Sequence, residues 1–301
     1  MRFRDWATRV MLIFLLFASL ILALIVGGSR KVENNAMTSP PDTIVGNQYP
    51  QALFRVETKT DTQTKNSPNS ANLYQQPLQK SPAPRNQTNQ VVSQYVTTAT
   101  FTDYKPNLAA ATIDPSNYGE RYTRDVNGVL LQNQPIVVLH ETTNSAASAI
   151  NFFRNNHVDE NVQASYHTLI ALDGTVIYLV PPDKRAFGAG NSVFQGVNGI
   201  ETVKTNPDLP PSVNNFAYHV SLETPPDAWG KSNIKEHSGY TEEQYNSLAW
   251  LIAQSQVPDD RITTHQAVDV ANGKVDPLSF DFERFFNKLH SFREVKSFSN
   301  S

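Results

Sequence analysis

The segment IVVLHETT, at residues 136–143, decides the fold class of this 301-residue chain. Its four consecutive apolar residues, Ile136 to Leu139, predict a β-strand, and unbroken apolarity is typical of a strand covered on both faces. His140 ends this strand. Behind residues that can cap a helix, at 143–145, apolar residues follow at helical spacing: Ala146, Ala149, Ile150 and Phe153. The sequence therefore places His140 at a junction between a buried strand and a helix.

More strands follow this junction. Two β-rich runs, 166–171 and 175–180, flank a turn that contains Asp173 and Gly174, and this arrangement predicts a β-hairpin. Further strands are predicted at 218–223 and around Ile262.

Two amphipathic helices are predicted in the C-terminal part. Thr241 and Gln244 have the spacing of a capping box at the start of the first helix, and Pro258 stops that helix. The second helix closes the domain, with apolar residues Phe282, Phe285, Phe286 and Leu289. Because strands and helices alternate, we predict a single α/β domain in which helices flank a central mixed β-sheet.

The first 31 residues predict insertion into a membrane. Three arginines precede an apolar run from Val10 to Val26, which as a helix would be roughly 26 Å long, close to the thickness of a bilayer core. Positive charge before the run favours a cytoplasmic N-terminus. Val26 and Gly28 can also serve as the small residues of a cleavage site, so residues 1–31 are either a signal peptide or an uncleaved anchor, which we favour. A signal peptide and an anchor would each direct the rest of the chain out of the cytoplasm.

Residues 32–93 have the composition of a disordered linker. They are rich in Asn, Gln, Thr, Ser and Pro, and their apolar residues show no sustained helix or strand spacing. We therefore expect one folded domain at 94–292, tethered behind the N-terminal segment, and a C-terminal tail at 293–301.

Composition excludes several classes of function. The formal net charge is −3 and no long block of Lys or Arg occurs, so the electrostatic signature of a nucleic-acid-binding protein is missing. The chain has no cysteine, which excludes disulfides, thiolate nucleophiles and cysteine metal ligands.

Two of the seven histidines occupy positions suited to a metal. His140 ends one buried strand and His265 follows another, and strand ends are where open α/β sheets bind ligands. Catalytic zinc needs three protein ligands and one open position, and His140, His265 and Asp276 supply such a set. Asp269, seven residues before Asp276, is a rival carboxylate.

The other histidines are assigned to the framework or the surface. His167 and His219 neighbour candidate site residues, but neighbours on a strand point to opposite faces, so we assign both to structural roles. The three that remain lie in loop-like segments or near the chain end, and we expect them at the surface: His157, His237 and His290.

Five segments carry a family resemblance, in the same order as in the family. They are VVLHETT (137–143), ASYHTLIALDGTVIYLV (164–180), YHVSLETP (218–225), TEEQYNSLAWLIA (241–253) and THQAVDVANGKVDP (264–277). Together they resemble the zinc-dependent N-acetylmuramoyl-L-alanine amidases, a group that includes phage lysozyme-type amidases and animal peptidoglycan recognition proteins. The resemblance runs from about residue 130 to 290 and implies a sheet flanked by helices.

The resemblance also implies roles for single residues. The family's metal ligands match His140, His265 and Asp276, so its motif favours Asp276 over Asp269. Its acidic catalytic residue matches Glu223, which would act as general base on zinc-bound water. Its Lys matches Lys274, which would stabilise the oxyanion of the tetrahedral intermediate, and its Tyr matches Tyr166, which would donate to the same oxygen or to the water.

The activity implied is zinc-dependent hydrolysis of the amide bond between N-acetylmuramic acid and L-alanine in peptidoglycan. We expect the partners to be peptidoglycan or muropeptides and, through the N-terminal helix, a membrane; we expect a monomer that binds no nucleic acid. The catalytic domain would lie in the bacterial cell envelope outside the cytoplasm, or be secreted after cleavage. Two alternatives stay open: a membrane-anchored module that binds or senses peptidoglycan without turnover, and a structural zinc with His167 or His219 as fourth ligand.

The chain departs from the family in two places. Many members have a His-Ala-Gly motif lining the substrate groove, whereas this chain has Phe187-Gly188-Ala189-Gly190, with Gly188 at the His position. After Asp276-Pro277 it has Leu278-Ser279, where Gly is frequent. The first departure puts the substrate contacts in doubt, and the second the local turn.

Overall fold

The computed structural model describes residues 42–43, 94–231, 233–271 and 273–296. The chain divides into two units, Met1–Pro40 and Pro41–Ser301, and every described residue belongs to the second. Among the described residues, no helix combines the length and apolarity needed to cross a bilayer. The predicted anchor and most of the predicted linker lie outside the described residues, so both stay predictions.

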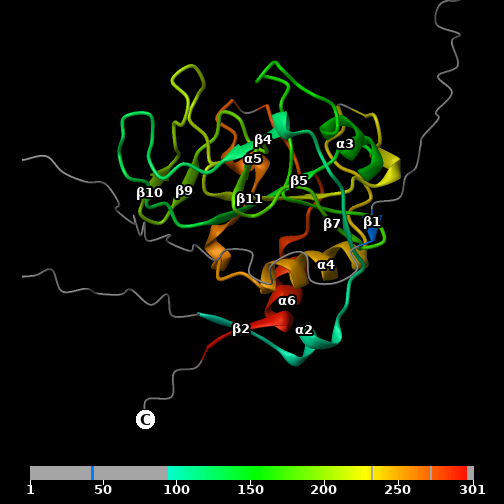
Figure 1. Ribbon diagram of the computed structural model, residues 1–301. Coiled ribbons are helices and arrows are strands. Elements are labelled where there is room, and N and C mark those ends of the chain that lie inside the picture. The colour runs from blue at the N-terminus through cyan, green and yellow to red at the C-terminus, as the bar shows by residue number, and fades with distance from the viewer. Residues whose placement is uncertain (1–41, 44–93, 232, 272, 297–301) are drawn as a thin grey trace, which may run out of the picture. The chain divides into compact units, whose positions relative to one another are not determined.

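The centre of the domain is a mixed sheet, as predicted, and this sheet has seven strands (Figure 1). In spatial order its strands are β1 (Asp42–Thr43), β3 (Leu108–Ala110), β7 (Val176–Tyr178), β6 (Thr168–Ile170), β11 (Ala217–Leu222), β5 (Ile136–Glu141) and β12 (Ile262–Thr264). Strands β6, β11, β5 and β12 run parallel to one another, whereas β6 and β7 form the predicted antiparallel hairpin.

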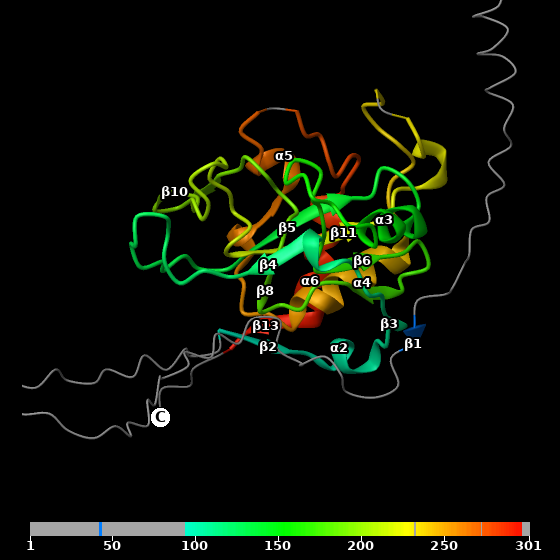
Figure 2. The same cartoon turned by 45° about the horizontal axis from the view of Figure 1, so that its top comes forward.

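Helices cover both faces of this sheet (Figure 2). Helices α4 (Glu242–Ala253) and α6 (Phe282–Phe292) pack on one face, and α3 (Ala146–Phe153) packs on the other. The predicted capping box is present at α4: Gln244 N–H donates to Thr241 Oγ1, and Thr241 N–H donates to Gln244 Oε1. The described part of the chain also contains α2 (Ala99–Asp103), α5 (His265–Val268) and the 3-10 turns Pro115–Asn117, Pro226–Ala228 and Asp259–Arg261.

Alternation along β5 and β11 separates the two faces. Val137 and Leu139 of β5 belong to the apolar core beneath α4 and α6, together with Tyr218, Val220 and Leu222 of β11. Ile136 and Val138 of β5 and Ala217 of β11 belong to a different cluster on the opposite face. Every residue of β5 is buried, as its unbroken apolarity predicts. His140, one residue after Leu139, therefore lies on the face turned away from α4 and α6.

Three smaller antiparallel pairs complete the described fold. They are β2 (Tyr95–Thr97) with β13 (Arg293–Val295), β4 (Tyr118–Glu120) with β8 (Lys184–Ala186), and β9 (Phe194–Gly196) with β10 (Gly199–Glu201).

Two segments differ from the predicted domain bounds. Residues 293–295, predicted to begin a tail, form β13 because the buried Arg293 donates to Asp259 Oδ1 at 2.7 Å and lies over the Tyr95 ring. Asp42–Thr43, within the predicted linker, pairs with Ala109–Ala110 of β3.

Candidate metal centre

Three neighbouring parallel strands bring the candidate residues to one edge of the sheet. His140 lies near the end of β5, and its register partner on β11 is Ser221, two residues before Glu223. His265 directly follows β12, whose last residue pairs with Leu139. The carboxyl ends of parallel strands share an edge, so the predicted clustering of strand-end residues is realised here.

His140, His265 and Asp276 form a compact donor cluster. Asp276 Oδ2 lies 3.4 Å from His140 Nδ1, and Asp276 Oδ1 lies 3.0 Å from His265 Nδ1. Their potential ligand atoms all lie within 4.8 Å of one another. The side chains are 0%, 10% and 13% exposed, in the same order. The loop that carries Asp276 is joined to α5, because Gln266 N–H donates to the Asp276 carbonyl oxygen at 3.0 Å.

The protonation states of the cluster fit a divalent cation. Burial lowers the pKa of His140 to about 4, so its ring is neutral near pH 7, and its buried Nδ1 makes no regular hydrogen bond within the described residues. Burial raises the pKa of Asp276, but the neighbouring His140 and His265 rings outweigh it, so the pKa of Asp276 is lowered and the carboxyl stays ionised. Imidazole nitrogens with one carboxylate are a usual donor set for catalytic zinc.

The rival carboxylate is used elsewhere. Asp269 Oδ2 accepts hydrogen bonds from the backbone N–H groups of Gly273, at 2.7 Å, and Lys274, at 2.9 Å. These bonds shape the loop that leads to Asp276. Among the described residues, the potential metal group contains Asp276 and not Asp269.

His219 lies beside the cluster but is not a member of it, so its assignment to a structural role is not contradicted. Its Nδ1 is 2.9 Å from His140 Nε2, and it shares a strand face with Ser221. The alternation argument also does not apply to Tyr166 and His167. Both residues lie before β6, so they are not neighbours on a strand. His219 contacts the His140 nitrogen that points away from Asp276, so the potential metal group of the described residues has three members.

Glu223 is held by backbone groups from two elements. Its Oε1 accepts a hydrogen bond from Ala146 N–H, in the first turn of α3, at 2.8 Å, and its Oε2 accepts one from Leu172 N–H at 2.9 Å. The residue is 8% exposed. An ionised carboxylate has about four acceptor positions, so two remain for other groups.

Tyr166 contacts His140, and Lys274 acts on His140 through its charge. The Tyr166 ring centroid is 4.8 Å from that of His140, and burial, together with the Asp276 charge, raises the pKa of Tyr166 so that its hydroxyl stays protonated. Lys274 is exposed, and its positive charge adds to the lowering of the pKa of His140. Both side chains are therefore available as donors beside the cluster.

A buried network around Glu141 was missed in the sequence. Glu141 Oε2 accepts hydrogen bonds from Tyr240 Oη at 2.6 Å, His237 Nε2 at 2.9 Å and Leu278 N at 3.3 Å. The prediction of a surface His237 is wrong, because its side chain is fully buried against Glu141. No local pattern signals this network, since its partners lie 96 to 137 residues from Glu141 in the sequence. It anchors the turn after Asp276.

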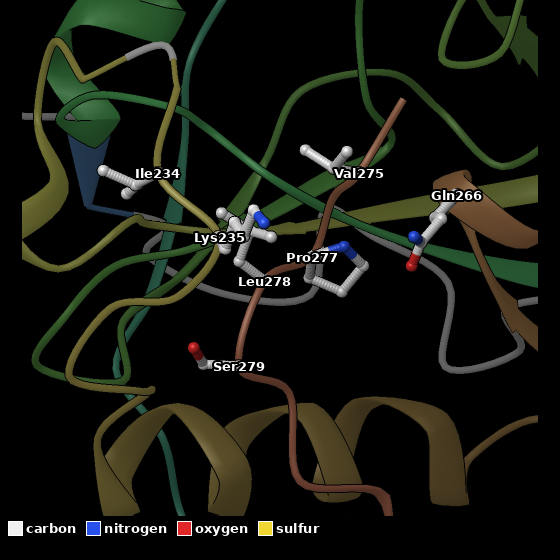
Figure 3. A pocket seen from close by; sticks show the side chains of 7 residues that line it. All are labelled: Ile234, Lys235, Gln266, Val275, Pro277, Leu278 and Ser279. Carbon is white, nitrogen blue, oxygen red and sulfur yellow. The ribbon is translucent and has the colours of Figure 1, made fainter. Parts of the chain in front are cut away.

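A pocket of about 370 Å³ adjoins Asp276 (Figure 3). Its lining residues are Ile234, Lys235, Gln266, Val275, Pro277, Leu278 and Ser279. Figure 3 shows the segment from Val275 to Ser279 passing between Lys235 and Gln266. The residues on either side of Asp276 thus form part of the pocket wall.

Comparison with known proteins agrees with the resemblance found in the sequence. Residues 132–279 match the family model described as N-acetylmuramoyl-L-alanine amidase. The 1,6-anhydro-N-acetylmuramyl-L-alanine amidase AmpD of Salmonella typhimurium strain SL1344 is 32% identical over 130 residues, which are 42% of this chain and 57% of that protein. The chain therefore spans little more than half the length of the curated relatives that it matches. The family resemblance is confirmed.

Solved structures of similar proteins include two from this group. A crystal structure of a selenomethionine derivative of AmpD has a TM-score of 0.42 and 23% identity, covering 60% of this chain and 94% of that one. AmiD of E. coli, in complex with the substrate anhydro-N-acetylmuramic acid-L-Ala-D-γ-Glu-L-Lys, has a TM-score of 0.40 and 18% identity, covering 57% and 65%.

Proposed function

We propose that this chain, whose residues 132–279 match the N-acetylmuramoyl-L-alanine amidase family model, hydrolyses the amide bond between N-acetylmuramic acid and L-alanine in peptidoglycan or muropeptides. The observation that carries the proposal is the cluster of His140, His265 and Asp276 at the same sheet edge as Glu223. Three donors leave one position of a tetrahedral cation open to water or substrate.

The donor set fits zinc. His140 Nδ1, His265 Nδ1 and one carboxylate oxygen of Asp276 would hold the ion. When bound there, zinc lowers the pKa of a coordinated water and polarises the scissile carbonyl.

Glu223 is the proposed general base. It would take a proton from the attacking water and pass it to the nitrogen of L-alanine as the amide bond breaks. The N–H groups of Ala146 and Leu172 fix the carboxylate in one orientation. Its remaining acceptor positions would receive the proton.

Lys274 and Tyr166 are the proposed stabilisers of the oxyanion. Attack on the carbonyl places a negative charge on its oxygen, and donors fixed in advance lower the energy of that state. The Lys274 ammonium offers charge, and the protonated Tyr166 hydroxyl offers a hydrogen bond.

The test is a Glu223→Gln substitution in the purified full-length chain loaded with zinc. Purified sacculi and a soluble 1,6-anhydromuropeptide serve as separate substrates, and mass spectrometry detects peptides with a free L-alanine amino group. We expect product from the wild type and about 10²- to 10⁴-fold less from the variant. Glu294→Gln, an exposed carboxylate on β13, is the matched control and should keep full activity.

Zinc content and sacculus binding of the variant are measured in the same preparations. Both should stay unchanged, because Glu223 belongs to neither the donor cluster nor the surface. A zinc-loaded wild type that binds sacculi and releases no peptide would instead favour a binding or sensing module without turnover.

We also propose that residues 1–31 anchor the domain at the membrane, with catalysis outside the cytoplasm. The support is the apolar run Val10–Val26 behind three arginines. Mass analysis of the mature N-terminus separates the two forms: an intact Met1 in the membrane fraction supports an anchor, and loss of about 28 residues supports a cleaved signal peptide.

A further inference from the structure

Gly188 has no space for a side chain, because the His219 ring occupies it. A Cβ atom at Gly188 would lie 2.4 Å from Nδ1, 2.5 Å from Cγ and 2.9 Å from Cε1 of His219. Unstrained contacts between such atoms need about 3.5 to 4.0 Å. Gly190, two residues later, is different: a Cβ atom there would meet nothing within 4 Å. The restriction is therefore local to the contact with His219.

The His219 ring cannot turn away easily. The side chain is fully buried and stacks on the ring of His167, with centroids 5.9 Å apart and planes inclined by 9°. The backbone N–H of His219 donates to His167 Nδ1 at 2.9 Å, and the N–H of His167 donates to the His219 carbonyl oxygen at 3.0 Å. These contacts hold the ring against Gly188.

The same ring contacts a member of the donor cluster. His140 Nδ1 faces Asp276 and needs its lone pair to bind a cation, so in the ligating His140 ring the proton lies on Nε2. His140 Nε2–H then donates to His219 Nδ1 across 2.9 Å. A hydrogen bond of this kind to the second nitrogen fixes both the tautomer and the orientation of a ligating imidazole.

We propose that His219 is a positioning residue for His140, and that Gly188 is the residue that admits it. An imidazole placed by the β11 backbone thus fills the space that a side chain at position 188 would take. The inference rests on the proposed metal-dependent function, since it concerns the affinity of the donor cluster for its cation. It also explains why position 188, where the family resemblance leads one to expect histidine, holds glycine in this chain.

The test compares two replacements of His219 in the full-length chain. His219→Asn keeps a hydrogen-bond acceptor near the position of Nδ1, whereas His219→Leu keeps volume and removes the acceptor. Zinc affinity is measured by competition with a chromophoric chelator, without substrate. We expect the zinc Kd to rise about 10- to 100-fold in His219→Leu and to recover most of that loss in His219→Asn. Equal affinity of His219→Leu and wild type would overturn the proposal, because space-filling alone would then suffice.

The role of Gly188 is tested with a double-mutant cycle. Gly188→Ala adds one methyl group that must displace the His219 ring, so it should weaken zinc binding to a similar extent. In a His219→Ala background, which removes that ring, the same change should cost little further affinity. Gly190→Ala is the matched control and should leave zinc affinity unchanged. Equal losses for Gly188→Ala in both backgrounds would refute the pairing of the two residues.

Cobalt(II) gives a readout of geometry that is separate from activity. The d–d absorption of cobalt(II) in the site should change in His219→Leu and return toward the wild-type spectrum in His219→Asn. An unchanged spectrum in His219→Leu would contradict the proposal. Tight zinc binding by a wild type that hydrolyses nothing would refute the proposed activity and leave this inference standing, so the two failures are distinguishable.

Discussion

The two faces of strands β5 and β11 carry opposite chemistry. On one face, Val137 and Leu139 of β5 pack with apolar residues of β11 against α4 and α6. On the other face, His140 of β5 and His219 of β11 hydrogen-bond beneath the donor cluster. Both faces are buried. The apolar face gains stability because its hydrophobic side chains leave water, whereas burying polar groups on the other face costs free energy unless they are neutral or paired.

The difference shows how one sheet can serve both stability and chemistry. A spacing of two residues is enough to send alternate side chains into an apolar core and a polar site. The histidines of the polar face are affected by burial. It lowers the pKa of His140 to about 4 and the pKa values of His167 and His219 well below their usual value. The folded state therefore favours neutral rings.

The largest expected effect is a loss of stability at low pH in the metal-free protein. Each of the three rings has a lower pKa folded than unfolded, so below about pH 6.5 the unfolded state binds more protons. The stabilisation is present above that pH and is lost as the pH falls toward the folded pKa values. From pH 7.5 to 5.5 each ring that stays neutral in the fold costs on the order of 1 kcal/mol, and three such rings together cost up to about 4 kcal/mol. Urea unfolding with EDTA at both pH values measures this.

A pH-independent free energy of unfolding over that interval would contradict the depressed pKa values. Saturating zinc should reduce the loss at the higher pH values, because a bound cation competes with protons for the same nitrogen atoms.

The second effect concerns the apolar face. Leu248 of α4 is fully buried in the core with α6, so Leu248→Ala should lower the free energy of unfolding by about 3 kcal/mol, within the usual range of 2 to 5. Because no titratable group is removed, the loss should be the same at pH 7.5 and 5.5. Zinc affinity of the folded variant should equal that of the wild type. A large fall in zinc affinity would mean that the two faces are not independent.

Much of this division was predictable from the sequence, because its signals are local. The apolar run before His140, the hairpin around Gly174 and the capping box at Thr241 each lie within a few residues, and the structure contains all three elements. The strand-end positions of His140 and His265 follow from the same patterns. Asp276 needed the family motif, since Asp269 is an equally good carboxylate in spacing alone.

What was missed depends on contacts between distant segments. His237 lies 96 residues from Glu141 in the sequence, and β13 has only three residues, too few for any periodicity. The position of His219 was open to inference, because it is four residues before Glu223 along the predicted strand 218–223 and therefore on the same face of that strand. Its contact with His140 depends on the register of β5 against β11, which no single-strand pattern gives.

The smallest expected effect tests a link between the faces. Thr241 Oγ1 caps α4 and donates to the Leu172 carbonyl oxygen at 2.7 Å, while Leu172 N–H donates to Glu223. Thr241→Ala removes the cap and should lower the free energy of unfolding by about 1 kcal/mol. The hydrogen bond between Leu172 N–H and Glu223 does not involve Thr241, so the base should stay in place. We therefore expect kcat of the zinc-loaded chain to change by less than about threefold, which corresponds to about 0.7 kcal/mol in activation free energy. Thermal unfolding and muropeptide hydrolysis measure the two quantities, with Thr241→Ser, which retains the hydroxyl, as the control. A tenfold fall in kcat at unchanged zinc content would show that the cap on the apolar face positions the base on the other.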